Sequence, residues 1–147
     1  QSRTFAGAFA DMTVLVDTSV WSLALRRDMA QNIPEVNELR RLVEGADSIV
    51  TTGLVLQELL QGFHGAKAVV DIIERFQALP FLMPDRSDHI AAAEIRNTCR
   101  RSGVQIGTVD AMLIQLCIRH DVTLLSTDKD FQHASRCIAF DLWRDNG

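Results

Sequence analysis

The chain has 147 residues, of which 47% are hydrophobic and 23% are charged, and its formal net charge is -4 at pH 7. This balance is typical of a globular chain of one domain and leaves little room for a long disordered segment. The negative charge argues against a broad basic face for nucleic acid, although it leaves room for local binding. No apolar run approaches the ~20 residues that span a bilayer, so a membrane protein is not expected.

The N-terminal segment and the cysteines indicate where the fold begins and in which compartment it works. Residues 1–11 precede Met12 and lack the charged start and the apolar segment of a signal peptide, so we expect an added or disordered extension. Residues 12–147 are then expected to form a single domain. Cys99, Cys117 and Cys137 are odd in number and have no C-x-x-C spacing, which favours a reducing, cytoplasmic location over a disulfide framework or a zinc site.

Short apolar segments alternate with longer stretches of helical period, which is typical of an α/β fold with a parallel sheet. The predicted strands occupy 13–17, 48–51, 80–83, 123–126 and 137–140. The predicted helices occupy 18–27, 33–45, 53–63, 65–78, 86–102, 108–120 and 129–134, with ends good to about three residues. The helix over 108–120 is the clearest, because its apolar residues recur on one face: Val109, Met112, Leu113, Leu116 and Cys117.

Three aspartates stand where such a fold would bring them together. Asp17 follows the apolar run Thr13-Val-Leu-Val16, and Asp128 follows Thr123-Leu-Leu-Ser126, so both leave the carboxyl ends of predicted strands. Asp110 lies in the first turn of the helix that leads to the later strand. Ligands of open parallel sheets bind at these strand ends, and magnesium prefers oxygen ligands. The arrangement predicts a metal-dependent nuclease.

Each carboxylate also has an ordinary structural interpretation. Asp17 and Asp128 fit as N-caps of the helices that follow them, and Asp110 fits as a first-turn acid that complements the helix dipole. Glu58 lies on the polar face of its predicted helix, opposite several apolar residues, so solvation alone explains it. Asp130 fits ordinary solvation, or an outer-sphere role beside Asp128.

The arginine groups have two interpretations as well. Guanidinium groups match phosphate oxygens, so these clusters could position RNA, yet solvated helix faces are the stronger explanation of each cluster. The clusters are Arg26 with Arg27, Arg40 with Arg41, and Arg96 with Arg100 and Arg101.

Four segments occur in one order along the chain: Val14-Leu-Val-Asp17-Thr-Ser19, Leu56-Gln-Glu58-Leu-Leu, Thr108-Val-Asp110-Ala-Met-Leu-Ile114 and Leu124-Leu-Ser-Thr-Asp128-Lys-Asp-Phe131. Together they resemble the PIN-domain ribonucleases, most closely the VapC-type toxins of bacterial toxin-antitoxin pairs. The resemblance extends from Thr13 to Trp143. It implies a three-layer α/β/α domain with a central parallel sheet, and it places the acidic positions of the family on Asp17, Glu58, Asp110 and Asp128. The hydroxyl that the family often places two residues before its last acid falls on Ser126.

The resemblance implies a toxin that cleaves RNA with a metal-activated water. Mg²⁺, with Mn²⁺ as a substitute, would be held by Asp17, Asp110 and Asp128, with Glu58 binding directly or through water. The implied partners are RNA, a VapB-type antitoxin and a second copy of the chain in a homodimer. Two alternatives stay open: a noncatalytic PIN-like module that binds RNA or protein, and a receiver-like phosphotransfer domain. The second is poorly supported, because the chain lacks clear counterparts of its nucleophilic aspartate and late-strand lysine.

Overall fold

A computed structural model describes residues 12–26, 32–45 and 48–146, and its centre is a parallel sheet of three strands. β1 (Thr13–Val16) lies between β2 (Ser48–Val50) and β3 (Thr123–Leu125). Leu15 of β1 lies opposite Val50 on one side and Leu124 on the other. The strands consist largely of buried aliphatic residues, as expected where helices cover both faces of a parallel sheet.

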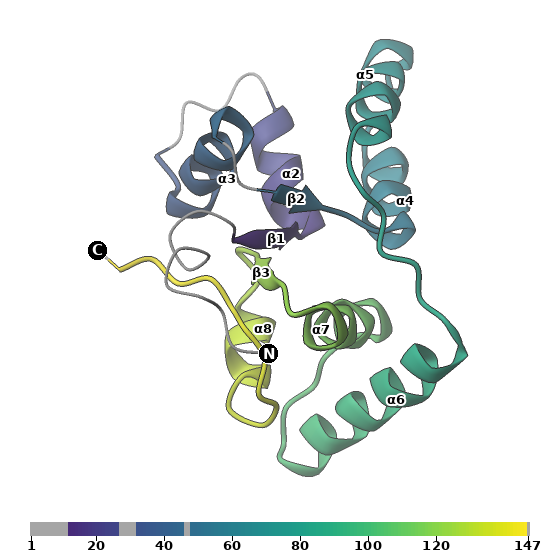
Figure 1. Ribbon diagram of the computed structural model, residues 1–147, viewed down its shortest axis with the longest axis vertical. Coiled ribbons are helices and arrows are strands. Elements are labelled where there is room, and N and C mark those ends of the chain that lie inside the picture. The colour runs from purple at the N-terminus through teal and green to yellow at the C-terminus, as the bar shows by residue number, and fades with distance from the viewer. Residues whose placement is uncertain (1–11, 27–31, 46–47, 147) are drawn as a thin grey trace.

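Helices cover the sheet in two layers (Figure 1). On one side lie α2 and α3, and on the other lie α7, α6 and α8, while α4 and α5 extend beyond the sheet. The bounds in the described chain are α2 (Thr18–Leu25), α3 (Pro34–Glu44), α4 (Gly53–Gly62), α5 (Ala66–Gln77), α6 (Arg86–Arg101), α7 (Thr108–His120) and α8 (Lys129–Ala134). This is the predicted three-layer α/β/α architecture with a central parallel sheet.

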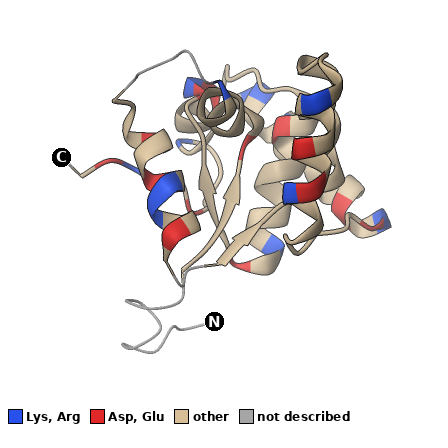
Figure 2. Cartoon of the chain, turned by 90° about the horizontal axis from the view of Figure 1, so that it is seen from above, with Lys and Arg blue, Asp and Glu red and all other residues tan. Residues whose placement is uncertain are grey.

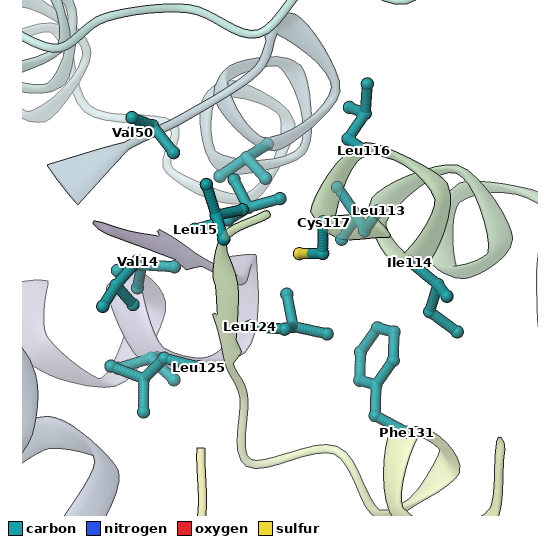
Figure 3. Packing of buried hydrophobic residues seen from close by; sticks show 14 of the residues in the cluster. Val14, Leu15, Val50, Leu113, Ile114, Leu116, Cys117, Leu124, Leu125 and Phe131 are labelled. Carbon is teal, nitrogen blue, oxygen red and sulfur yellow. The ribbon is translucent and has the colours of Figure 1, made fainter. Parts of the chain in front are cut away.

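Helix α7 packs on β3 in the buried core. Figure 3 shows Leu113 and Cys117 of α7 close to Leu124 of β3, with Phe131 of α8 beside Ile114. Four of these side chains have no exposed surface and Cys117 is 2% exposed. Because α7 is fixed on its apolar face, its first turn is held at the carboxyl end of the sheet.

The predicted helices all occur in the described chain, with ends within two residues of the prediction. The predicted extension of the first helix to Arg27 and the predicted N-terminal extension over 1–11 both lie outside the described residues. Among the helices of the described ranges, none has the length and hydropathy of a membrane span.

The predicted strand at 80–83 is wrong. Only Phe81 forms a bridge, with Thr51, through hydrogen bonds from the Thr51 N–H to the Pro80 carbonyl (3.0 Å) and from the Leu82 N–H to the Thr51 carbonyl (2.7 Å). Prolines stand on both sides of this bridge, at Pro80 and Pro84. Because proline has no N–H to donate, the ladder does not extend into a strand.

The predicted strand at 137–140 is also wrong. The N–H groups of Cys137 and Ile138 both donate to the Ala134 carbonyl at 2.9 Å, so the chain turns back on the end of α8. Parallel pairing begins later, at the bridge between Leu142 and Leu124. The apolar run therefore continues the turn of α8 and supplies packing residues rather than a strand.

Candidate functional site

Strand β1 and strand β3 end side by side. Asp17 directly follows β1, and Asp128 follows β3 after Ser126 and Thr127. The Asp17 N–H donates to the Leu125 carbonyl at 2.9 Å, which fixes Asp17 at the end of β3 as well as of β1. Asp17 is the N-cap of α2, and Asp128 is the N-cap of α8. Each aspartate therefore occupies the helix N-cap position expected from the sequence. This position also places both residues at the same edge of the sheet.

The Asp17 carboxylate is buried and held by two serines. The hydroxyls of Ser19 and Ser126 both donate to Asp17 Oδ2, each at 2.8 Å. The residue is 7% exposed, so these bonds form where little water competes. Each hydroxyl has one proton, which is directed at Oδ2, and Oδ1 has no hydrogen-bond partner among the described residues. One oxygen of a rigidly held carboxylate is thus available to a cation.

The same serines organise the loop that carries Asp128. The Thr127 N–H donates to Ser19 Oγ at 3.1 Å, and the Asp128 N–H donates to Ser126 Oγ at 3.0 Å. The Asp128 carboxylate in turn accepts from the Asp130 N–H at 2.9 Å. Two hydroxyls therefore connect the carboxylate at the end of β1 to the backbone that follows β3.

Three carboxylates form a close group beside Asp17. One oxygen from each of Asp110, Asp128 and Asp130 lies within 4.8 Å of the other two. Among the described residues, this group contains no histidine or cysteine. Asp130 adds a further acid to the predicted set, and its signal in the sequence is its spacing, two residues after Asp128 in the first turn of the same helix.

Asp110 is the electrostatically strained member of the group. Burial raises the pKa of its carboxyl group, and the negative charges of Asp128, Asp17 and Asp130 raise it further. The Gly107 N–H, which donates to Asp110 Oδ2 at 3.2 Å, opposes this increase in pKa. A positive charge placed among these carboxylates would relieve the repulsion.

Glu58 lies at the border of the acidic group. It is exposed on α4, and its Oε1 accepts a hydrogen bond of 2.7 Å from the hydroxyl of Thr18, the residue after Asp17. The structure thus connects Glu58 to the start of α2, outside the close group formed by Asp110, Asp128 and Asp130. A direct or water-mediated metal contact by Glu58 stays a prediction.

The donor set fits a hard divalent cation. Carboxylate oxygens from separate elements suit Mg²⁺ or Mn²⁺, whereas zinc sites usually include histidine or cysteine. Asp17, Asp110 and Asp128 are the predicted ligands that this edge of the sheet brings together. Ser19 is a positioning residue to which the sequence pattern assigned no role, and its signal in the sequence is the Asp-x-Ser spacing at a helix start.

Known proteins share this fold. Residues 14–136 match the family described as PIN domain, and no curated protein matches the chain. VapBC2 from Rickettsia felis, solved bound to a DNA fragment from its promoter, has a TM-score of 0.69 and 19% identity, covering 90% of this chain and 100% of that chain. FitAcB from Neisseria gonorrhoeae has a TM-score of 0.67 and 22% identity, and the match covers 89% of this chain and 96% of that chain.

A third similar structure is VapC20 from Mycobacterium tuberculosis, described as a sarcin-ricin loop cleaving toxin. Its TM-score is 0.65 at 19% identity, and the match covers 86% of this chain and 95% of that chain. At these identities the likeness establishes a shared fold. The family match extends over most of the chain, from β1 to the end of α8, and includes Asp17, Glu58, Asp110 and Asp128. The chain therefore belongs to the PIN domain family.

Proposed function

We propose that this protein is a metal-dependent endoribonuclease and the toxin of a toxin-antitoxin pair. The observation that carries the proposal is the convergence of Asp17, Asp110 and Asp128, from three separate elements, at the carboxyl edge of the sheet. Membership of the PIN domain family and the fold shared with VapC20, which is described as a sarcin-ricin loop cleaving toxin, support it.

The carboxylates have separable tasks in this mechanism. Asp17, Asp110 and Asp128 would hold Mg²⁺, or Mn²⁺ in its place, with Glu58 contacting the cation directly or through water. When bound, the cation would supply the charge that activates a water and stabilises the attacked phosphate. Ser19 and Ser126 keep the Asp17 carboxylate in one orientation, which lowers the cost of ordering it around substrate and cation.

The reaction is hydrolysis of an RNA phosphodiester by water. The close acidic group of the described chain contains no imidazole that could act as a general base for the substrate's own 2′-hydroxyl. Attack by water leaves a 5′-phosphate and a 3′-hydroxyl on the products. Analysis of the ends of a cleaved oligonucleotide checks this chemistry, and cyclic phosphate ends with activity persisting in EDTA would exclude it.

The decisive experiment is to sequence RNA ends after controlled expression in cells. Wild-type protein is expected to produce new ends at defined sites, while Asp17→Asn and Asp110→Asn produce none. Asp141→Asn is the matched control, because Asp141 is an exposed aspartate outside the acidic group and the charge change is the same. Equal cleavage by wild type and Asp110→Asn would contradict the proposal.

The proposed partner is a small antitoxin of VapB type that covers the acidic edge with Arg or Lys side chains. The concentration of carboxylates around Asp110 favours a cationic segment there, and VapBC2 is a similar structure named as a complex. A homodimer of the chain is part of the same proposal. Co-expression with the neighbouring gene product is expected to yield a stable complex without ribonuclease activity. If no such product suppresses cleavage, a stand-alone nuclease is the better assignment.

A further inference from the structure

A cavity of about 270 Å³ lies between α6, α7 and the start of α4. Its apolar wall includes Leu54, Ala92, Ala93 and Met112, and its polar groups include Arg96 and Asn97. This volume is near the lower end of the range for small-molecule sites, which begins at roughly 300 Å³. The cavity therefore suits one flat ring system better than a larger ligand.

The cavity borders the first turn of α7, which also carries Asp110. Thr108 and Val109, which also form its wall, directly precede Asp110 in the first turn of α7. A nucleic acid strand with one phosphate at the carboxylates would place a neighbouring nucleotide at this wall. The backbone N–H groups in the first turn of α7 add positive potential on the same side.

Arg96 is held in place and retains hydrogen-bond donors. Its Nε donates to the Ile106 carbonyl at 2.8 Å, which fixes the guanidinium between α6 and the segment before α7. Its two Nη groups have no hydrogen-bond partner among the described residues. An anchored guanidinium with free donors matches the oxygens of a phosphate.

Asn97 presents a donor as well. Its Oδ1 accepts from Arg100 at 2.5 Å, so its amide nitrogen is the group left for a ligand. An amide N–H beside apolar side chains can donate to a ring nitrogen or carbonyl on the edge of a base. Single-stranded RNA is recognised in this way, through unstacked bases placed between side chains and bonded along their edges.

We propose that this cavity receives an unstacked nucleobase of single-stranded RNA next to the cleaved phosphate, with Arg96 contacting a flanking phosphate and Asn97 the edge of the base. This role depends on the nuclease activity proposed above, to which it adds a pocket that selects the cleavage site. It also explains how a chain of net charge -4 binds RNA without a broad basic face.

Methyl NMR tests whether RNA enters the cavity. Wild-type protein with labelled Leu, Val and Met methyl groups is titrated with a short single-stranded RNA in EDTA, so that no cleavage is needed for the signal. The methyl signals of Leu54, Val109 and Met112 are expected to shift. Inorganic phosphate alone is expected to leave them in place, which separates binding of the base from capture of an anion.

Two pairs of variants assign the binding to the cavity. Ala93→Phe fills it from an exposed position of α6, and we expect it to abolish the methyl shifts, whereas Ala66→Phe, at an exposed position of α5, leaves them unchanged. Arg96→Gln is expected to weaken RNA binding by about tenfold, whereas Arg101→Gln, on the same helix outside the cavity, changes it less than about twofold. Thermal denaturation confirms that each variant is folded.

The outcomes separate this inference from the proposed function. RNA ends from cells expressing Ala93→Phe are expected to lose base preference at a fixed position beside the cut. Methyl shifts in a wild-type protein that cleaves nothing would support binding of a nucleobase in the cavity, and would reject the nuclease together with the selection of a cleavage site. Cleavage with unchanged methyl signals, as expected if a protein segment is the true occupant, would overturn the nucleobase site alone.

Discussion

The ionised form of Asp110 is unfavourable in the folded chain without a cation. Burial and the charges of Asp128, Asp17 and Asp130 raise the pKa of this carboxyl group, so the folded protein binds its proton more tightly than the unfolded protein does. Above the ordinary aspartate pKa of about 3.9, ionised Asp110 therefore reduces the free energy of unfolding. Below that value both states are protonated, and the penalty disappears.

Asp110→Asn is expected to raise the Tm in EDTA at neutral pH by about 2–4 °C, the change that corresponds to about 1 kcal/mol in a chain of this size. The asparagine Oδ1 can still accept from the Gly107 N–H, so the helix start is preserved. Differential scanning calorimetry between pH 7 and pH 3.5 measures the effect, with Asp141→Asn as the control. A gain that persists or increases at low pH would contradict this origin of the effect.

Ser126 acts on the site through Asp17 and Asp128. Its hydroxyl donates to Asp17 Oδ2 and accepts from the Asp128 N–H, so Ser126→Ala removes one fixed donor and one acceptor. We expect cleavage to fall by about tenfold and the Mg²⁺ concentration for half-maximal activity to rise, because both proposed ligands become less ordered. Ser135→Ala, which removes a hydroxyl that bonds outside the acidic group, is the control. An unchanged metal requirement would show that Ser126 has only a structural role.

At the scale of elements, α7 connects the core to the site. Ile114 has no exposed surface, whereas Ile118, one turn later on the same helix, is 44% exposed. Ile114→Ala is expected to lower the free energy of unfolding by about 2–5 kcal/mol, because it leaves a cavity in the packed layer over β3. Ile118→Ala is the matched control and should cost under about 1 kcal/mol. Urea denaturation of both variants compares them, and similar losses would place the core elsewhere.

The Asp88 carboxylate of α6 forms hydrogen bonds with two side chains of α7. Its carboxylate is fully buried and accepts from the Asp85 N–H (2.9 Å), from the Gln115 amide (3.1 Å) and from Arg119. Burial raises the pKa of Asp88, but these donors together hold it below its ordinary value. The charge of Asp88 therefore stabilises the fold above the ordinary aspartate pKa, and this stabilisation is lost as the pH falls through the lowered value.

Asp88→Asn is expected to cost about 2–4 kcal/mol at pH 7, since it leaves the donors of Arg119 and Asp85 without a carboxylate. The loss should diminish as the pH approaches the lowered pKa of Asp88. Urea unfolding at several pH values measures it, and Glu94→Gln, at an exposed position on the same helix, is the control. A loss that is independent of pH down to that range would assign the effect to packing instead.

At the scale of the molecule, the proposed metal binding would be coupled to folding. A cation that binds only the folded state stabilises it by RT ln(1 + [L]/Kd), which is about 2.7 kcal/mol at a hundredfold excess over Kd. For a chain of this size, Mg²⁺ or Mn²⁺ should raise the Tm by roughly 5–10 °C. The increase in Tm should be much smaller in the double variant that carries both Asp17→Asn and Asp110→Asn. Calorimetry in EDTA and in metal compares them, and an equal increase in both proteins would place the cation elsewhere.

The charge distribution favours local rather than extended binding of the proposed RNA substrate. Figure 2 shows Lys and Arg interspersed with Asp and Glu along the helices, while the strands are mostly uncharged. Binding of an RNA strand is therefore expected to depend on a cation held at the acidic edge and on single contacts such as the one from Arg96.

The sequence by itself determined the local structure and the position of the main carboxylates. The aliphatic run of β1, the apolar face of α7 and the cap position of Asp128 each depend on neighbouring residues, so their patterns are visible in the chain. Because parallel strands end at one edge, the meeting of Asp17 and Asp128 followed from the same patterns.

Only the tertiary structure decided the contacts that depend on register across the fold. The apolar runs at 80–83 and 137–140 resemble strands, but the prolines beside Phe81 and the turn after α8 prevented them from forming ladders. The bond between Ser126 and Asp17 joins residues 109 positions apart, and the cavity beside Asp110 needs three helices in place. Periodicity records which face of an element is buried. It does not record which distant residue lies opposite, because that depends on how the strands pair and how the helices pack.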